Sequence, residues 1–183
     1  DLIAAAEVIV TISHAGYIKR NAVSLYRAQR RGGKGKIGMG IKEEDFVVNL
    51  FTASTHDSLL FFTDAGKVYW LKVHEIPEAS RAAKGKALVN LLALSSNEKV
   101  TATLPVKEFR DDRYIVMGTK KGIIKKTELS AFSNPRQGGI IALGLESGDK
   151  LISVQLTDGQ REILLGTRQG LTIRFKEEEV RSM

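Results

Sequence analysis

The chain has 183 residues, of which 43% are hydrophobic and 27% charged, a balance that is typical of a globular protein and excludes a disordered one. No apolar run approaches the roughly 20 residues of a bilayer-spanning helix, and the absence of cysteine excludes disulfides and thiolate metal sites. The net charge of +7 indicates an anionic partner, nucleic acid or a membrane surface, and a basic protein without such a partner is the plain alternative.

The cysteine content and the first residue give two further expectations. A chain without cysteine is compatible with the reducing cytoplasm, and no signal-peptide pattern opens it. Because it begins at Asp1 and not at a Met, we expect it to be a piece of a longer protein.

Internal repeats organise the chain. Four segments share one pattern, in which an apolar run is followed by Ser or Thr, two variable residues, Gly, and a second run of apolar and basic residues: Ile9–Lys19, Leu60–Tyr69, Ile115–Lys125 and Ile163–Ile173. The glycines stand at 16, 66, 122 and 170, so the steps are 50, 56 and 48 residues. That period suits a propeller-like blade and is too long for most helical repeats.

Each repeat predicts a β-hairpin, because both runs are short and rich in Val, Ile, Phe and Tyr. The Thr-x-x-Gly spacing predicts a type I turn closed by a glycine with positive φ. The nearly continuous apolar run Leu59–Phe62 predicts a first strand that is buried on both faces. The second runs, Ile123–Lys126 and Leu171–Arg174 among them, are expected to turn their cations toward solvent.

A basic or glycine-bearing patch, another apolar run and a strand with an acidic start follow the first three hairpins; the acidic starts are Asp45, Glu98 and Asp149. Each unit therefore offers about four strands, which predicts an all-β, propeller-like array of about three and a half blades. Helix should be limited to single turns at Val73–Pro77, Glu128–Phe132 and Glu177–Arg181. The expected blades cover 1–44, 45–97, 98–148 and, as a partial fourth, 149–183.

The most basic patch follows the first hairpin and Tyr26, and its residues are Gln29, Arg30, Arg31, Gly32, Gly33, Lys34 and Gly35. Its glycines remove side-chain bulk where the cations are densest, so that backbone N–H groups and cationic side chains approach an anionic polymer together. A solvated loop is the alternative. The run Gly33–Gly38 also matches G-x-G-x-x-G, but no apolar strand precedes it and no amphipathic helix follows it, which argues against a dinucleotide site.

We predict no catalytic residue, no cofactor site and no metal site. The three histidines, His14, His56 and His74, are isolated in sequence, and no G-x-S-x-G motif or convincing pair of acidic residues is present. One of Tyr69 and Trp70 is expected to face the core. The run Glu177–Glu179 is expected to be a solvated loop.

The remaining basic residues recur at corresponding places in the repeats, so we predict that they form a basic stripe along the rim of the array. Such a stripe neutralises phosphates along a bent duplex without reading its bases. The predicted DNA-binding residues besides the patch at 29–35 are Lys19, Arg20, Lys36, Lys67, Lys72, Arg81, Lys84, Lys86, Lys120, Lys121, Lys125, Lys126, Arg136, Arg168 and Arg174.

These motifs resemble a known family. The run Tyr26–Gly35 resembles the A-box of the DNA gyrase A subunit, and Thr11–Arg20, Ala53–Asp57 and Tyr69–Ala79 resemble other parts of its C-terminal domain. The resemblance covers essentially the whole chain, and the box is a specific motif. The related topoisomerase IV subunit shares the blades but usually lacks or degrades the box, so its presence favours gyrase.

The resemblance implies a β-pinwheel, which differs from a propeller in the strand connection between blades. It implies a domain that wraps double-stranded DNA around its rim, anchored by the box, so that ATP-driven strand passage introduces negative supercoils. It also implies that the catalytic residues lie elsewhere in an assembly of two A and two B subunits in the bacterial cytoplasm, near the nucleoid. A topoisomerase IV-type domain and a propeller-like protein-interaction module are the alternatives.

Overall fold

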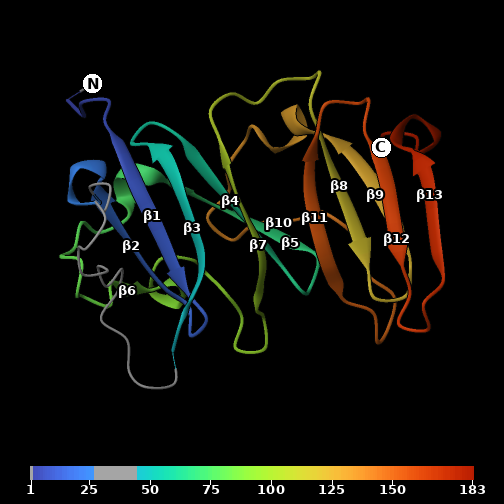
Figure 1. Ribbon diagram of the computed structural model, residues 1–183, viewed down its shortest axis with the longest axis horizontal. Helices are drawn as coiled ribbons and strands as arrows, with labels where there is room; N and C mark the ends of the chain where they lie inside the picture. Colours follow the sequence, from blue (N-terminus) through green and yellow to red (C-terminus); the bar gives the residue numbers. More distant parts are fainter. Residues whose placement is uncertain (1, 27–44) are drawn as a thin grey trace, which may run out of the picture. The chain divides into compact units, whose positions relative to one another are not determined.

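Figure 1 shows the computed structural model of the chain, which describes residues 2–26 and 45–183. Within those ranges the regular elements are β-strands and short 3-10 turns, without an α-helix. This confirms the predicted all-β class. None of the described helical segments is long and apolar enough to cross a membrane.

The four repeats form four β-hairpins: β1 (Glu7–Ser13) with β2 (Tyr17–Ala22), β4 (Ser58–Thr63) with β5 (Lys67–Lys72), β8 (Tyr114–Thr119) with β9 (Ile124–Glu128), and β12 (Glu162–Gly166) with β13 (Thr172–Lys176). At each tip the glycine N–H donates to the carbonyl of the Ser or Thr three residues earlier, at 3.0 Å. The glycine φ angles lie between +76° and +89°, where a β-carbon is disfavoured. The predicted turn is therefore confirmed at Gly16, Gly66, Gly122 and Gly170.

Five further strands extend the hairpins into sheets: β3 (Val47–Ser54), β6 (Lys86–Ala87), β7 (Val100–Val106), β10 (Ile140–Ile141) and β11 (Leu151–Thr157). The strand orders are β3-β1-β2-β6, β10-β5-β4-β7, β11-β8-β9 and β12-β13. Strands β3, β7 and β11 lie beside the first strand of the hairpin before them. Strands β6 and β10 instead return to an earlier hairpin and pair antiparallel with β2 and β5.

Because of these returns, the first two sheets combine strands from distant parts of the sequence. Strand β3 begins after position 44, yet it pairs with β1 in the first sheet. The same sheet takes β6 from residues 86 and 87, which lie beyond the second hairpin. The blade bounds 1–44, 45–97, 98–148 and 149–183 stay a prediction.

Burial of the first strands follows the apolar pattern. All four residues from Leu59 to Phe62 have no accessible surface, which confirms that this strand is buried on both faces. Side chains of this kind stabilise a fold by about 1.5–3 kcal/mol each. Tyr69 is also buried, as expected for one of the adjacent aromatic residues, whereas Trp70 is only partly so.

Short 3-10 turns follow the second strands of the hairpins. Three of them begin at or next to the predicted single turns and confirm them: η2 (Val73–Glu75), η4 (Leu129–Phe132) and η5 (Glu177–Glu179). Two others, η1 (Val23–Leu25) and η3 (Leu88–Asn90), were not predicted from the sequence.

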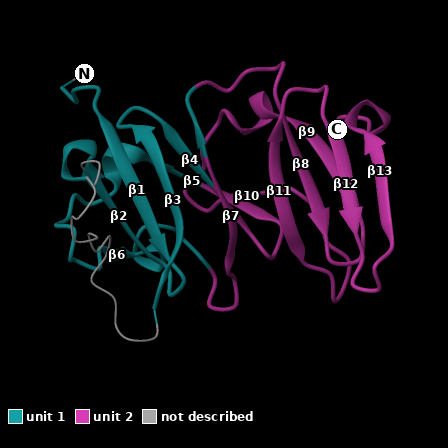
Figure 2. Ribbon diagram, viewed as in Figure 1, with its two compact units in different colours: residues 1–60, 70–94, 105–107 teal, residues 61–69, 95–104, 108–183 magenta. Residues whose placement is uncertain are grey.

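The chain divides into two compact units, drawn in different colours in Figure 2. Unit 1 comprises 1–60, 70–94 and 105–107, and its core includes Val10, Ile18 and Val73. Unit 2 comprises 61–69, 95–104 and 108–183. In unit 2 the rings of Phe62 and Phe132 meet edge to face with centroids 5.8 Å apart.

Candidate nucleic-acid interface

The predicted DNA-binding residues that the structure describes differ in exposure. The box residues Gln29 to Gly35 and Lys36 lie outside the described residues. Seven predicted cations are exposed: Lys72, Lys86, Lys120, Lys121, Arg136, Arg168 and Arg174. Five are half-buried, namely Arg20, Lys67, Arg81, Lys84 and Lys125, and two are buried, Lys19 and Lys126.

Lys19 serves the protein backbone. Its Nζ donates to the carbonyls of Ser80, Arg81 and Ala83, at 3.2, 2.5 and 3.0 Å. Burial, helped by the positive charge of Arg81, lowers the pKa of the Lys19 ammonium. We therefore assign Lys19 to positioning: it holds the basic patch of the second repeat against β2 and does not itself face solvent.

Aromatic rings position two cations of that patch. The Lys84 ammonium lies 4.4 Å from the centre of the Tyr17 ring, and the Arg81 guanidinium lies 5.3 Å from the centre of the Tyr26 ring. Contacts of this kind contribute about 0.5–1 kcal/mol at exposed sites. Tyr17 lies in the first repeat and Tyr26 follows it in the sequence, but only the fold brings both tyrosines to a patch some sixty residues away.

The backbone of the same segment runs directly against β2. Arg20 Nε donates to the Ile76 carbonyl at 2.7 Å, and the Arg20 N–H donates to the Pro77 carbonyl at 3.2 Å. Gly85 has φ +87°, and a β-carbon there would collide with the Ile18 carbonyl oxygen. Unit 1 thus gathers Arg20, Arg81, Lys84 and Lys86 along β2.

Several predicted cations of unit 2 also donate to backbone carbonyls, as Lys19 does. Lys67 Nζ donates to the Gly138 carbonyl at 3.1 Å, Lys125 Nζ to the Ala142 carbonyl at 3.0 Å, and Lys121 Nζ to the Ser147 carbonyl at 2.7 Å. Each acceptor belongs to the segment between the third hairpin and β11. Lysines of the hairpins therefore fasten the segments that connect successive repeats.

The exposure of Lys126 and Glu177 differs from what the sequence predicted. Lys126 was expected to face solvent and Glu177 to lie in a solvated loop, but their side chains are 7% and 0% exposed and their charged atoms are 3.5 Å apart. The Glu177 carboxylate also accepts hydrogen bonds from Thr157 Oγ1 at 3.0 Å and the Arg161 N–H at 2.9 Å. The Lys126 ammonium lies 4.4 Å from the centre of the Tyr114 ring. Both predictions of solvent exposure are wrong, because η5 folds back over β9.

A carboxylate binds each of the first three hairpin tips. Asp45 accepts from the N–H of Ala15 at 2.9 Å, and Asp149 accepts from the N–H of Lys121 at 2.9 Å. Glu98 accepts from Thr63 Oγ1 and Tyr69 Oη, each at 2.7 Å. Burial opposes ionisation of all three, but these hydrogen bonds outweigh it and lower the pKa of each carboxyl.

Metal-binding side chains do not come together in the described part of the chain. In the ranges 2–26 and 45–183, no three His, Cys, Asp or Glu side chains are grouped as metal ligands. His14 stacks on Phe46 with ring centroids 4.7 Å apart, and His56 Nε2 lies 2.9 Å from the Ile3 carbonyl oxygen. These two histidines have structural partners of their own.

Comparison with known proteins decides the family. The model of the family described as "DNA gyrase C-terminal domain, beta-propeller" matches the chain in four segments, 7–54, 57–107, 113–158 and 161–183. The chain belongs to this family. The four matched segments each contain one hairpin, so the gyrase C-terminal domain repeat coincides with the repeat found in the sequence.

Gyrase A subunits from several bacteria share half of the residues. The DNA gyrase A subunit of Haemophilus influenzae is 51% identical over 183 residues, and that of Halalkalibacterium halodurans is 50% identical over 183 residues. Both alignments cover 100% of this chain but only 21% and 22% of the relatives. The chain thus spans about a fifth of their length.

Solved structures show the same fold. A crystal structure of the C-terminal domain of DNA topoisomerase IV matches with a TM-score of 0.84 at 29% identity, over 100% of this chain and 55% of the other. A structure of the DNA gyrase A C-terminal domain matches with a TM-score of 0.72 at 24% identity, over 97% and 57%. The second likeness, at that identity, concerns the fold alone.

Proposed function

We propose that this chain binds and wraps double-stranded DNA as part of DNA gyrase. The observation that carries the proposal is the gyrase C-terminal domain repeat itself, with cations at corresponding positions in successive copies. In the described part of the chain, Lys120 and Arg168 both stand two residues before a tip glycine and are exposed, and the exposed Lys86 and Arg136 lie in the segments after the second and third hairpins. The net charge of +7 supports a polyanionic partner.

The proposed mechanism is electrostatic. Cations neutralise phosphates and release counterions, which gives affinity without base recognition. Bending a duplex by 40–90° over 20–30 base pairs costs about 1–6 kcal/mol, so contacts must continue along the path. We place the anchor of that path at the box, Gln29 to Gly35, whose resemblance to the gyrase A-box favours gyrase over a topoisomerase IV-type domain.

In the whole enzyme, the wrapped duplex would be presented to catalytic parts that the gyrase B subunit supplies together with the rest of the gyrase A polypeptide. This chain contributes binding and no catalytic residue to an ATP-dependent type IIA topoisomerase. We place the assembly, with two A and two B subunits, in the bacterial cytoplasm with the nucleoid. The alternative, a propeller-like protein-interaction module, predicts capture of an acidic protein and no change in DNA topology.

Ligation of a nicked plasmid in the presence of the protein tests wrapping. After deproteinisation, we expect a linking-number shift toward positive values that grows with protein concentration. Tight DNA binding without any shift would contradict wrapping, and absence of DNA binding would contradict the proposal as a whole.

Replacement of Arg30, Arg31 and Lys34 together by Ala tests the anchor. We expect weaker DNA binding and a salt dependence that is shallower by about 0.9 for each lost phosphate contact. The linking-number shift should also be lost. A variant with Lys99, Lys107 and Lys176 changed to Ala is the control, because it loses the same charge at exposed positions outside the predicted interface. Equal effects of both variants would leave the box without a specific role.

A further inference from the structure

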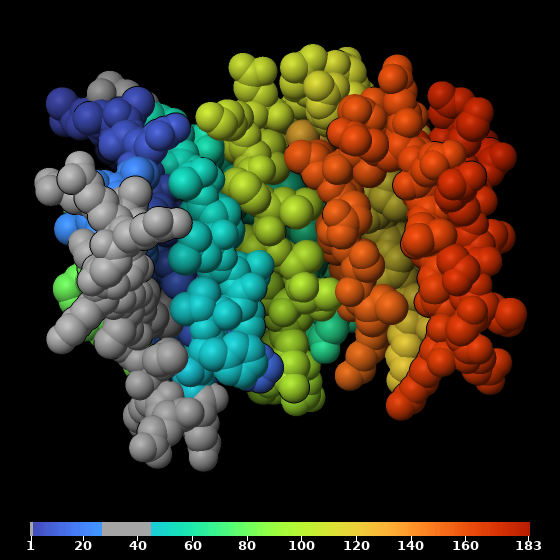
Figure 3. Space-filling view, in the orientation of Figure 1, coloured from blue at the N-terminus to red at the C-terminus, as the bar shows by residue number. Residues whose placement is uncertain are grey.

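Residues 80–86 form a basic segment that lies against β2 in unit 1. The segment carries Arg81, Lys84 and Lys86 and no carboxylate. In Figure 3, atoms in the colours of residues near 20 and of residues near 85 both reach the drawn surface at the left edge. A surface segment of this charge is suited to an anionic partner.

Lys19 fixes the backbone of the basic segment from its inner side. Its ammonium donates to the carbonyls of three residues of the segment. The N–H of a trans peptide points away from the carbonyl of the same peptide, so the N–H groups of Ala82 and Lys84 point away from the buried Lys19. Neither of these N–H groups donates to an acceptor in the described part of the chain. The segment therefore turns carbonyls inward and positive groups outward.

An aromatic ring holds each of two cations of the segment. The Lys84 ammonium lies 4.4 Å from the centre of the Tyr17 ring, and the Arg81 guanidinium lies 5.3 Å from the centre of the Tyr26 ring. Lys84 forms no ion pair with a described carboxylate, and Asp45 attracts it from a longer distance. Because a ring carries no net charge, the contact with Tyr17 orients Lys84 without neutralising it.

Two other lysines lie over rings but have a second partner. Lys126 is also 4.4 Å from a ring centre, and its ammonium pairs with Glu177. Lys67 is 5.1 Å from a ring centre, and its ammonium donates to the Gly138 carbonyl. Within the ranges 2–26 and 45–183, Lys84 is thus the lysine that lies over a ring without a hydrogen bond or ion pair of its ammonium.

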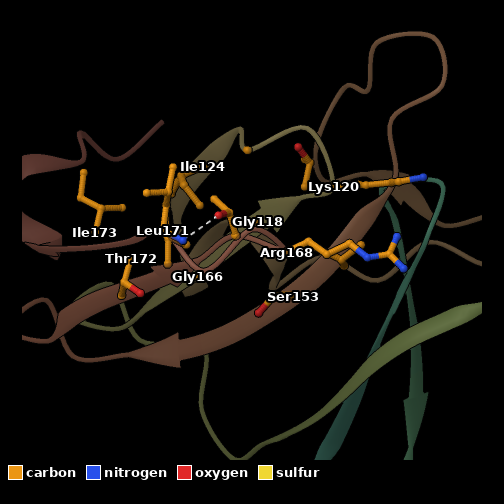
Figure 4. A pocket seen from close by; sticks show the side chains of 14 residues that line it. Gly118, Lys120, Ile124, Ser153, Gly166, Arg168, Leu171, Thr172 and Ile173 are labelled. Carbon is orange, nitrogen blue, oxygen red and sulfur yellow. Dashed lines mark hydrogen bonds between the residues drawn. The ribbon is translucent and has the colours of Figure 1, made fainter.

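Two exposed cations of unit 2 have no such ring beside them. Figure 4 shows Lys120 and Arg168 on one side of an apolar groove of about 520 Å³, at the tips of the third and fourth hairpins. Neither cation lies over an aromatic ring of the described residues. A phosphate that binds either of them must immobilise a long side chain, which costs affinity.

We propose that Tyr17 and Tyr26 are positioning residues for DNA binding, whose rings hold Lys84 and Arg81 ready to meet phosphates of the duplex. The inference rests on the proposed function. Each ring restricts its cation before DNA arrives, so that less conformational freedom is lost when the phosphate binds. Neither tyrosine belongs to the set of cations that the sequence predicts to contact DNA.

Tyr17→Leu in the full chain tests the role of the ring. We expect it to bind a linear duplex about two- to tenfold more weakly, because Lys84 must then be immobilised on binding. The salt dependence should keep its slope, since Lys84 still meets its phosphate, whereas Lys84→Ala should lower the slope by about 0.9. Tyr17→Phe, which retains the ring, should restore the affinity.

Tyr114→Leu is the matched control. It removes a ring at the same 4.4 Å distance from Lys126, whose ammonium is buried and paired with a carboxylate. Its affinity for DNA should equal that of the unsubstituted chain. Circular dichroism and urea denaturation establish the folded fraction of each variant, so that affinities refer to folded protein.

A double-mutant cycle separates positioning from a structural role. Added to Lys84→Ala, Tyr17→Leu should cause no further loss of affinity, because the ring acts through Lys84. An equal loss in both backgrounds overturns the inference, and so does unchanged affinity of Tyr17→Leu, while DNA binding by the unsubstituted chain upholds the proposed function in either case. Absence of DNA binding by the unsubstituted chain overturns both.

Discussion

At the scale of single residues, several lysines of the predicted DNA-binding set donate hydrogen bonds to the protein backbone. Lys19, Lys67 and Lys125 each donate to carbonyls of a connecting segment that lies later in the sequence. Alternation along a strand indicates which side chains share a face, but it does not reveal that a connecting segment will cover that face. The cations therefore fall into two groups. One group holds the connecting segments, and the exposed group can face a polyanion.

A substitution at Gly85 tests how closely the segment that carries Arg81, Lys84 and Lys86 packs on β2. In a Gly85→Ala variant, the new β-carbon meets the Ile18 carbonyl in addition to the unfavourable positive φ. The φ alone costs about 1–2 kcal/mol. We expect the loss in unfolding free energy to exceed that of Gly16→Ala, which has φ +86° and no atom within 4 Å of the added carbon. Urea denaturation of both variants measures the difference, and equal losses would contradict close packing at Gly85.

At the scale of elements, η5 is attached to β9 and β11 by a buried charge. Glu177 occupies the place of Val73 and Leu129 in the second and third repeats, since all three N–H groups donate to the carbonyl of the residue sixteen positions earlier. An apolar side chain fills that place in the second and third repeats, whereas Glu177 pairs with Lys126. The fourth repeat thus replaces a hydrophobic contact with a charged one.

A double-mutant cycle tests this attachment. Glu177→Val should reduce the unfolding free energy by about 3–5 kcal/mol, because it leaves the Lys126 ammonium buried without its carboxylate. Combining it with Lys126→Met should recover most of the loss, since a well-packed apolar pair often replaces a buried ion pair without cost. Glu178→Gln, at an exposed neighbour, is the control and should change stability by no more than about 0.5 kcal/mol. Additive effects of the two substitutions would contradict direct pairing.

At the scale of the whole molecule, the same capping carboxylate recurs in three repeats. Asp45, Glu98 and Asp149 each follow a connecting segment and bind a hairpin tip. Their pKa values lie below the ordinary 3.8 for aspartate and 4.5 for glutamate. The unfolded chain therefore binds more protons than the folded chain in the acidic range.

We expect the unfolding free energy to decrease as the pH is lowered. The contribution of each carboxylate is fully present above its unfolded pKa, so above about pH 5, and disappears as the pH falls through the lower folded pKa. In Asp149→Asn, stability at pH 7 should be reduced and its decline between pH 5 and pH 3 should be shallower. Asp111→Asn, in an exposed loop, is the control. Chemical denaturation at several pH values in this range measures the unfolding free energy of each protein. Parallel pH profiles for the unsubstituted chain, Asp149→Asn and Asp111→Asn would contradict the role of Asp149.

Features of the fold that are set by neighbouring residues were predictable from the sequence. The glycine turns, the buried run Leu59–Phe62 and the single helical turns each depend on a few consecutive residues, and the structure confirms them. The return of β6 to β2 and of β10 to β5 was not predictable, because each joins residues about seventy positions apart. The exposure of Lys126 and Glu177 was mispredicted for the same reason.

The sequence by itself determined the repeat, the hairpins and the family, because periodic apolar runs and turn glycines leave few other folds open. Only the tertiary structure decided which lysines face solvent, which carboxylates bind a hairpin tip and where an apolar groove remains. The physical reason is that burial is a property of the segment that comes to lie over a residue. In this chain, that segment comes from a later repeat.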